Sequence, residues 1–390
     1  MPIETTMCGS WYRPPEVLGL MSTWSGEFYP EHKEIVEKAE RDAIRVQVHP
    51  NGSKRGLDYV SNGDERKSGY TTFLPSRMSG FSKTERNTMV MPARMIQEMT
   101  DSNPALVAAL SSGQMQFANL PKIVEPLKYT GAELAKAEAR DAVRLAKEEG
   151  AKHIFVKSPS PGVITVFYPR TAVYKDHWEY LAALSKELRK EYEAILSVPG
   201  VDLHIDAPDT AMTNALAEGW GVGFYEALPK HIDAVNEAIR GLPADRIRLH
   251  YCYGNYNGSH LNDPPFGRVL PELLRANVGM IVGENANPAH EGDFLAVRNY
   301  VKEHGWPKSV RFAIGAIDVK TPIVETPETV AGRLERYASI DGIGPERVLG
   351  STDCGFGTFG GFDNTTLKVG VQKLENLVKG AELANKMYGG

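Results

Sequence analysis

Short apolar runs alternate with longer segments of helical periodicity along this chain. The runs have the length of buried strands and lie at residues 4–8, 57–61, 153–157, 201–205, 247–252, 280–283, 310–314 and 347–350. Segments 131–150 and 177–198 carry alanine, leucine and charged residues at helical spacing. Thr326 and Pro327 supply an N-cap and a first-turn proline for a helix over 328–340. Repeated strand and helix units of this kind indicate a parallel sheet.

Eight such units predict an α/β fold, a (β/α)8 TIM barrel that spans residues 1–390 as a single domain. Residues 62–126 interrupt the repeat, because they are polar, rich in glycine, serine and methionine, and without clear periodicity. We interpret them as an insertion after the second strand that folds over the active face. The main alternative is a doubly wound dinucleotide-binding sheet, which needs a glycine fingerprint after its first strand. The glycine-rich stretches at 219–223 and 355–361 do not fit that pattern or a phosphate loop, and we interpret both as turns.

Composition narrows the classes of partner. Lysine and arginine total 44 against 49 acidic residues, a net charge of -5, and no basic run is interleaved with aromatics, so we expect no nucleic-acid partner. No segment has the features of a secretory signal or the run of about 18 apolar residues of a membrane span. Three cysteines are too few for a disulfide framework and are typical of a reducing compartment. We therefore expect a cytoplasmic protein with no membrane partner.

The expected strand ends carry metal-binding side chains. In a barrel the loops after the strands converge on one face, where the chemistry takes place. The alternation of a strand places His250 and Cys252 on the same side, at the end of the fifth strand. The sixth strand ends at Glu284, and the eighth leads to Cys354. An imidazole, two thiolates and a carboxylate favour zinc over magnesium or calcium.

Each of these side chains also has an ordinary structural interpretation. A single cysteine most often packs as a small buried hydrophobe, and Glu284 at a strand end is equally suited to cap a helix or form a salt bridge. The two cysteine sites together, one with a histidine two residues earlier, favour the metal site. Cys8 also ends a strand, but Gly9 follows it directly and no second type of ligand lies beside it, so we assign Cys8 to packing.

Six short motifs follow one another along the chain. They are Gly9-Ser10 with Arg13-Pro14, residues 61–66 (SNGDER), 158–161 (SPSP), 204–208 (HIDAP), 250–255 (HYCYGN) and 352–356 (TDCGF). Their order, spacing and strand placement resemble those of the zinc-dependent, cobalamin-independent methionine synthases. The resemblance extends to the short single-barrel members, including the epoxyalkane coenzyme M transferases, and covers nearly the whole chain. It implies a barrel of the methionine synthase and uroporphyrinogen decarboxylase-like type.

The resemblance implies a role for each motif. The zinc ligands are His250, Cys252, Glu284 and Cys354, and the residues that bind the acceptor are Ser10, Asp64 and Asp206. Asp318 or Lys320 donates the proton that the leaving group needs. Ion pairing within the protein is the structural alternative for both Asp64 and Asp206. Several aromatic residues either line the donor pocket or pack the barrel rim, namely Trp11, Tyr12, Tyr168, Tyr251 and Tyr253.

We therefore predict an enzyme that transfers a methyl or alkyl group onto a zinc-activated small-molecule thiol, with homocysteine as the first candidate acceptor and a methyl-folate among the candidate donors. Three positions depart from the family pattern: Asp64 replaces a glutamate, Ala207 follows Asp206 where an acid is usual, and Lys320 stands where the full-length synthases carry a histidine. Full-length synthases also have two barrels. An epoxide-opening or other-donor alkylthiol transferase is the alternative within the family. A metal-free decarboxylase or binding protein with buried cysteines is the alternative from another class.

Overall fold

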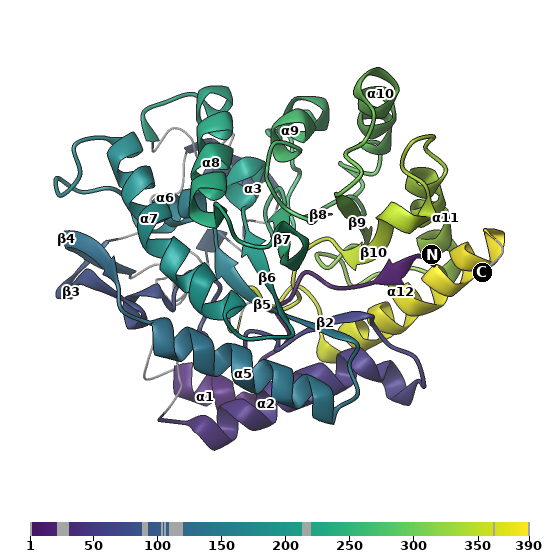
Figure 1. The fold of residues 1–390 in the computed structure, drawn as a ribbon, viewed down its shortest axis with the longest axis horizontal. Coiled ribbons are helices and arrows are strands. Elements are labelled where there is room, and N and C mark those ends of the chain that lie inside the picture. Colours follow the sequence, from purple (N-terminus) through teal and green to yellow (C-terminus); the bar gives the residue numbers. More distant parts are fainter. Residues whose placement is uncertain are drawn as a thin grey trace.

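Eight parallel strands form a nearly closed barrel in the computed structural model (Figure 1). The structure describes residues 2–21, 31–87, 93–102, 104, 107–108, 120–212, 220–361 and 363–388. The barrel strands are β1 (Glu4–Thr5), β2 (Tyr59–Ser61), β5 (His153–Pro159), β6 (Val201–Asp206), β7 (Ile247–Tyr251), β8 (Met280–Gly283), β9 (Arg311–Ile317) and β10 (Val348–Thr352). Their order around the sheet is β1-β10-β9-β8-β7-β6-β5-β2. The predicted barrel and its strand positions are confirmed.

The first two strands bring the edges of the sheet together. The backbone N–H of Asp58 donates to the carbonyl of Thr5 at 3.0 Å. In return the Asp58 carboxylate accepts from the Thr5 N–H at 2.9 Å. These bonds satisfy edge groups that the short β1 leaves unpaired, and they bring the segment after β1 into the barrel mouth.

Helices surround the barrel (Figure 1). They are α1 (Pro15–Met21), α2 (Lys33–Val48), α3 (Ala93–Ser102), α5 (Ala132–Glu148), α6 (Pro161–Phe167), α7 (His177–Leu196), α8 (Phe224–Ile239), α9 (Phe266–Leu273), α10 (Phe294–His304), α11 (Pro327–Ala338) and α12 (Leu367–Met387). Short 3-10 turns lie at Pro50–Gly52, Leu74–Ser76, Pro208–Thr210, Ala244–Arg246 and Pro345–Arg347. The predicted N-cap is present, since the Thr326 hydroxyl accepts from the N–H of Thr329.

The outer helices have one apolar face each, and that face packs on the sheet. In α7 the buried Leu181, Leu184, Leu188 and Ile195 recur at the spacing of one helix face. Asp176 caps this helix by accepting from the N–H of Glu179 at 2.9 Å. The barrel strands are buried on both sides, which explains why they read as continuous apolar runs in the sequence.

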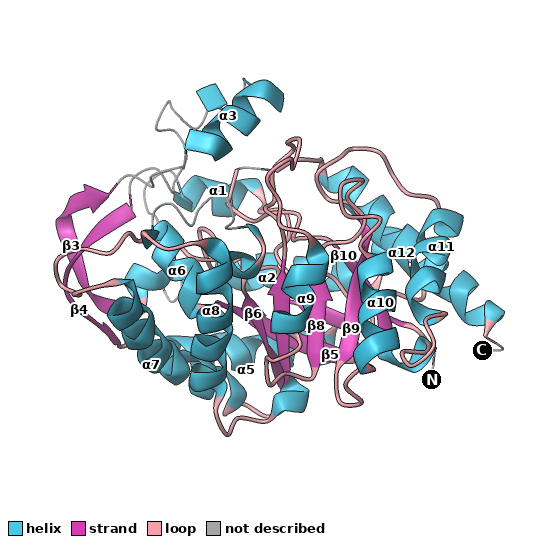
Figure 2. Cartoon of the chain, turned by 90° about the horizontal axis from the view of Figure 1, so that it is seen from above, coloured by secondary structure: helices cyan, strands magenta, loops and turns pink. Residues whose placement is uncertain are grey.

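The predicted insertion contains regular structure that the sequence pattern did not reveal. β3 (Met78–Asn87) and β4 (Leu120–Tyr129) form an antiparallel pair outside the barrel. The register of this pair shifts twice, and β4 carries Pro121 and Pro126, so neither strand shows a simple alternation. Figure 2 shows α3, which lies between them in sequence, set apart from the barrel helices. In α3, Glu98 accepts from the Asn262 side chain at 2.8 Å, which ties the insertion to the loop after β7.

Buried ion pairs fix the start of the insertion against the barrel helices. Arg66 pairs with Glu40 of α2 at 2.7 Å. Arg77 pairs with Glu138 of α5 at 2.6 Å and with Glu191 of α7 at 2.5 Å. Because these side chains are fully buried, their charges are compensated only in this arrangement. The segment that carries Asp64 is therefore held rigidly at the barrel mouth.

The ends of the described chain lie close together in Figure 1, where α12 runs beside β1. The Asn385 side chain accepts from the N–H of Ile3 at 2.6 Å and donates to its carbonyl at 3.1 Å. Among the described helices, none combines the length and the apolar character that a bilayer crossing requires.

Candidate metal centre

Three of the four predicted zinc ligands meet inside the barrel. His250 is the next-to-last residue of β7, Cys252 follows that strand directly, and Cys354 lies two residues after β10. All three are buried, and their ligand atoms lie within 4.8 Å of one another. Two strands separate β7 from β10 in the sheet, so the side chains approach one another across the narrow interior of the barrel.

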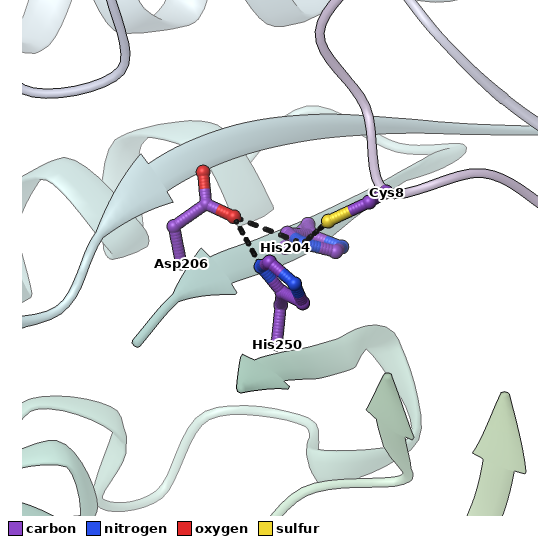
Figure 3. A group of neighbouring side chains, drawn as sticks. All are labelled: Cys8, His204, Asp206 and His250. Carbon is purple, nitrogen blue, oxygen red and sulfur yellow. Dashed lines mark hydrogen bonds and ion pairs between the residues drawn. The ribbon is translucent and has the colours of Figure 1, made fainter. Parts of the chain in front are cut away.

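A carboxylate orients the imidazole of this group. His250 Nδ1 lies 3.0 Å from Asp206 Oδ1 (Figure 3), and the two residues are paired in register on β6 and β7. Since a carboxylate accepts, Nδ1 is the donor. Nε2 lies 3.2 Å from the neutral carbonyl oxygen of Asp353, which also accepts, so a metal would bind Nε2 by displacing the proton that it donates there. A carboxylate behind a ligand histidine is the usual support of a zinc site.

The two thiols lie close enough to share a proton. A hydrogen bond from Cys354 and the nearby His250 lower the pKa of Cys252 to about 6, although burial opposes this shift. The same interaction and burial raise the pKa of Cys354 well above its usual value. The thiolate is the form that binds metals, so one ligand is already in its binding form at neutral pH.

Glu284, the fourth predicted ligand, lies next to this group but is engaged elsewhere. Its Oε1 pairs with Lys320 Nζ and accepts from Asn287 at 3.1 Å, and its Oε2 accepts from the N–H of Tyr253 at 2.9 Å. Lys320 lowers the pKa of Glu284 to about 2 against the effect of burial. To bind a metal shared with Cys252 and Cys354, Glu284 would exchange Lys320 for the ion. Its ligand role therefore stays a prediction.

Glu284 also belongs to a second group of possible ligands. Its carboxylate, His260 and His290 are buried and place one ligand atom each within 4.8 Å of the others. Both ring nitrogens of His290 already face carboxylates, Asp263 at 2.8 Å and Asp293 at 3.1 Å. An imidazole held in this way is doubly protonated, and it has no lone pair for a metal. We interpret this group as a charge network that supports the loops after β7 and β8.

Asp318 and Lys320, the predicted proton donors, lie together after β9. The Asp318 carboxylate accepts from the backbone N–H of Lys320 at 2.8 Å, and the N–H of Asp318 donates to Glu325 at 2.8 Å. Lys320 thus presents its ammonium to the barrel interior through its pair with Glu284. The structure brings Lys320 to the metal group, whereas Asp318 shapes the loop.

The predicted acceptor-binding carboxylates are bridged by a lysine. Lys157 Nζ lies 3.0 Å from Asp64 Oδ2 and 2.9 Å from Asp206 Oδ2. Burial acts to lower the pKa of Lys157, but the two carboxylates raise it above its ordinary value. Ser10, the third predicted acceptor residue, is buried, and its hydroxyl has no hydrogen-bond partner among the described residues. The ion-pairing alternative for Asp64 and Asp206 is thus observed.

Cys8 and His204 also lie in the site, and the sequence pattern assigned Cys8 to packing. Cys8 Sγ lies 3.9 Å from His204 Nε2, and His204 Nε2 lies 3.3 Å from Asp206 Oδ1 (Figure 3). With His250 these residues form a third group of possible metal ligands. His204 is two positions before Asp206 on β6, so strand alternation is a signal that would have placed it in the site.

The aromatic residues expected at the donor pocket or the rim are all buried. Trp11 and Tyr12 pack on Phe356, with ring centroids 5.2 and 5.5 Å apart. Tyr251 stacks on Phe266 at 5.1 Å, and Tyr253 stacks on His290. The Tyr168 hydroxyl donates to the carbonyl of Thr71 at 3.1 Å. These contacts support the packing interpretation.

The loops around the site are tied together by Arg13 and the glycine-rich segment 355–361. The Arg13 guanidinium donates to the backbone carbonyls of Lys67, Gly357 and Asp64 at 2.9, 2.5 and 3.2 Å. The N–H of Phe356 donates to the carbonyl of Ser10 at 2.8 Å. This segment forms the turns that were expected, while Gly219 of the other glycine-rich stretch lies outside the described residues.

Comparison with known proteins supports the family resemblance. No family model matches the chain. A methionine synthase of Sulfurisphaera tokodaii is 24% identical over 402 aligned residues, which cover 99% of this chain and 95% of that protein. A 2-hydroxypropyl-CoM lyase of Xanthobacter autotrophicus is 28% identical over 147 residues, 32% of this chain and 38% of that protein.

A solved structure has the same fold. It is the B12-independent methionine synthase of Shewanella sp. W3-18-1 in complex with selenomethionine, with a TM-score of 0.65 at 20% identity, over 100% of this chain and 99% of that chain. The fold, the full-length sequence match and the site motifs agree with one another. The chain is therefore similar over nearly its whole length to methionine synthases, and it shares its barrel fold with a B12-independent one.

Proposed function

We propose that this chain is a zinc-dependent transferase that moves a methyl or alkyl group onto a small thiol. The observation that carries the proposal is the buried group of His250, Cys252 and Cys354 at the strand ends of the barrel. Relatives named methionine synthase over the whole length and 2-hydroxypropyl-CoM lyase over part of it support the reaction class.

The donor set fits zinc. One imidazole nitrogen and two sulfurs are soft ligands in the number that a catalytic zinc site requires, with one position left for a further ligand. The Asp206 carboxylate supports the imidazole. Bound there, zinc would favour the thiolate form of a coordinated thiol and so provide the nucleophile. Glu284 is the proposed additional protein ligand, and a thiol would take its place or a fifth position.

The residues of the chain orient the reactants and move the proton. In the transfer a sulfur–carbon bond forms while a carbon–nitrogen or carbon–oxygen bond of the donor breaks. The electron pair of the broken bond stays on the leaving atom, which takes up a proton. We assign that proton to Lys320, whose ammonium reaches the interior, with Asp318 holding its backbone.

Two kinds of acceptor are in question. Homocysteine is the acceptor that the sequence resemblance implies, with a methyl-folate as one candidate donor. The ammonium of Lys157 between Asp64 and Asp206 favours a different thiol. An epoxide-opening reaction is the alternative for the donor side, supported by the partial match to the lyase.

A metal-free decarboxylase or a carboxylate-binding protein is less well supported. Such a protein would need arginines free to bind a carboxylate near the N-terminus, where the sequence offers Arg13. The Arg13 guanidinium instead donates hydrogen bonds to three backbone carbonyls. The buried thiols beside His250 would also have no role in that chemistry.

A mass-spectrometric screen tests the reaction. Zinc-loaded protein is incubated with a panel of thiols and with methyl-folate, methylcobalamin, methyl-ether and epoxide donors, and S-alkylated products are sought. We expect the wild type to alkylate at least one thiol. The Cys354→Ala variant should alkylate none. Transfer to no thiol from any donor would overturn the proposal, as would an undiminished rate in Cys354→Ala.

A further inference from the structure

A lysine ammonium occupies the place expected for an ammonium of the acceptor. Asp64 and Asp206 come from the segment after β2 and from the end of β6, and Lys157 of β5 reaches between them. All three side chains are almost completely buried, with 1%, 6% and 6% of their surface exposed. The ammonium and the two carboxylates are therefore ion-paired away from water.

Both carboxylates face positively charged or ring nitrogens of the protein. Asp206 Oδ2 pairs with Lys157, and its Oδ1 lies within 3.0 Å of His250 Nδ1 and 3.3 Å of His204 Nε2. Asp64 Oδ2 pairs with Lys157, and its Oδ1 faces a second ammonium, Lys67 Nζ, at 3.8 Å. A ligand ammonium that entered here would meet two lysines, one of which already lies within 3.0 Å of both carboxylates.

The surrounding backbone is shaped to hold Lys157. A Cβ on Gly9, whose φ is +130°, would lie 2.2 Å from Lys157 Cδ, so glycine at this position makes room for the lysine chain. Lys67 Nζ donates to the carbonyl of Lys157 at 2.9 Å and fixes the strand end. The backbone around Lys157 therefore accommodates its side chain and fixes its position in the site.

This ammonium is also connected to the metal group. Lys157 contacts Asp206, and Asp206 contacts His250, one of the three grouped ligands. A thiol held at the metal group would extend toward Lys157 within the same barrel mouth. Like charges in a buried site repel strongly, so Lys157 disfavours a chain that carries an ammonium, whereas a chain without one avoids this penalty.

We propose that Lys157 takes the place of a substrate ammonium, so that the acceptor of this enzyme is a small thiol without an ammonium group. The inference rests on the proposed function and narrows its substrate class. Asp64 and Asp206 then serve as positioning residues that hold Lys157 and His250, and Lys157 is the residue that sets specificity.

Pairs of thiols that differ only in the ammonium test this inference. Homocysteine is compared with 4-mercaptobutyrate, and cysteine with 3-mercaptopropionate, for binding to the zinc-loaded protein by calorimetry. We expect each deamino thiol to bind at least about 10-fold more tightly than its amino counterpart in the wild type. Lys157→Met should reverse or abolish this preference, and Lys157→Arg should keep it.

Lys152→Met is the matched control, because Lys152 lies just before the same strand and its side chain is 64% exposed. Its preference should equal that of the wild type. The wild-type comparison needs no variant, so poor folding of Lys157→Met would not remove the test. Equal or tighter binding of homocysteine would overturn the role of Lys157 and leave thiol transfer intact. Binding of no thiol would overturn the proposed function together with this inference.

Discussion

Replacing Asp206 with asparagine removes one charge from the centre of the site and keeps the shape of the side chain. The carboxylate lies 3.0 Å from His250 Nδ1 and 2.9 Å from Lys157 Nζ. Asparagine still has an oxygen for one of these groups but no negative charge for either. We expect two separate effects, one on zinc affinity and one on folding.

The loss of zinc affinity follows from the support that Asp206 gives to His250. Removing such a carboxylate typically weakens metal binding by about 10- to 100-fold, or about 1.4 to 2.7 kcal/mol. The folding effect follows from Lys157. Two unit charges 2.9 Å apart interact by about 6 kcal/mol at an effective dielectric constant of about 20. Lys157 retains its ion pair with Asp64 in this variant. We therefore expect the free energy of unfolding to fall by about 3 kcal/mol, the lower end of the range for a broken buried ion pair.

Competition with a chelator of known zinc affinity measures the first effect, and urea unfolding of the metal-free protein measures the second. Asp209→Asn is the matched control. Asp209 is a buried carboxylate three residues after the end of the same strand, it pairs with His231 at 2.9 Å, and among the described residues it belongs to no group of possible metal ligands. The control should lose stability and keep its zinc affinity. Zinc affinity of Asp206→Asn within about twofold of the wild type would refute the role given to this carboxylate.

The remaining predictions concern the neighbouring groups. Cys8→Ser should keep its zinc, because the ammonium of Lys157 beside Asp206 disfavours a metal ion in the group of Cys8, His204, Asp206 and His250. Loss of zinc from this variant, measured by mass spectrometry, would make Cys8 a metal ligand. Burial acts to lower the pKa of His290, but Asp263 and Asp293 raise it to about 9. Protonated His290 therefore adds to the free energy of unfolding, fully below pH 6.5 and less as the pH rises through about 9. The loss is at most about 3 kcal/mol. Urea unfolding across this range should show the decline in the wild type and not in His290→Asn. Lys320→Met and Glu284→Gln should each destabilise the metal-free protein by about 3 kcal/mol or more, because each breaks the same buried ion pair. The double variant should lose less stability than the sum of the two single losses, and additive losses in urea unfolding would contradict the pairing.

The barrel was predictable because its strands are buried on both faces. Such strands read as apolar runs at regular intervals, and the structure contains a strand at each expected position. The bounds differ by a few residues, as at Arg347, which lies in a 3-10 turn before β10. The pair β3 and β4 was not predictable, since its exposed faces, prolines and register shifts remove the alternation on which a strand prediction depends.

The metal group was predictable from strand alternation and from the convergence of strand ends, which bring His250, Cys252 and Cys354 together. Lys157 was not, because its partners become visible only when β5 and β6 are paired in register, with Lys157 opposite His204. Cys8 is held in the site because its N–H donates to the Thr352 hydroxyl at 3.0 Å, a contact between residues 344 positions apart in the sequence. Local sequence carries no signal for such contacts.

The zinc content of the purified protein shows whether His250, Cys252 and Cys354 hold a metal ion. Inductively coupled plasma mass spectrometry on wild type, Cys354→Ser and Cys8→Ser, each with its folding checked by circular dichroism, gives the number of metal ions per chain. We expect about one zinc ion per chain in the wild type and in Cys8→Ser, and less than about a tenth of that in Cys354→Ser. A folded wild type that binds no zinc after loading, or a Cys354→Ser protein that keeps all of it, would show that His250, Cys252 and Cys354 do not form a zinc site.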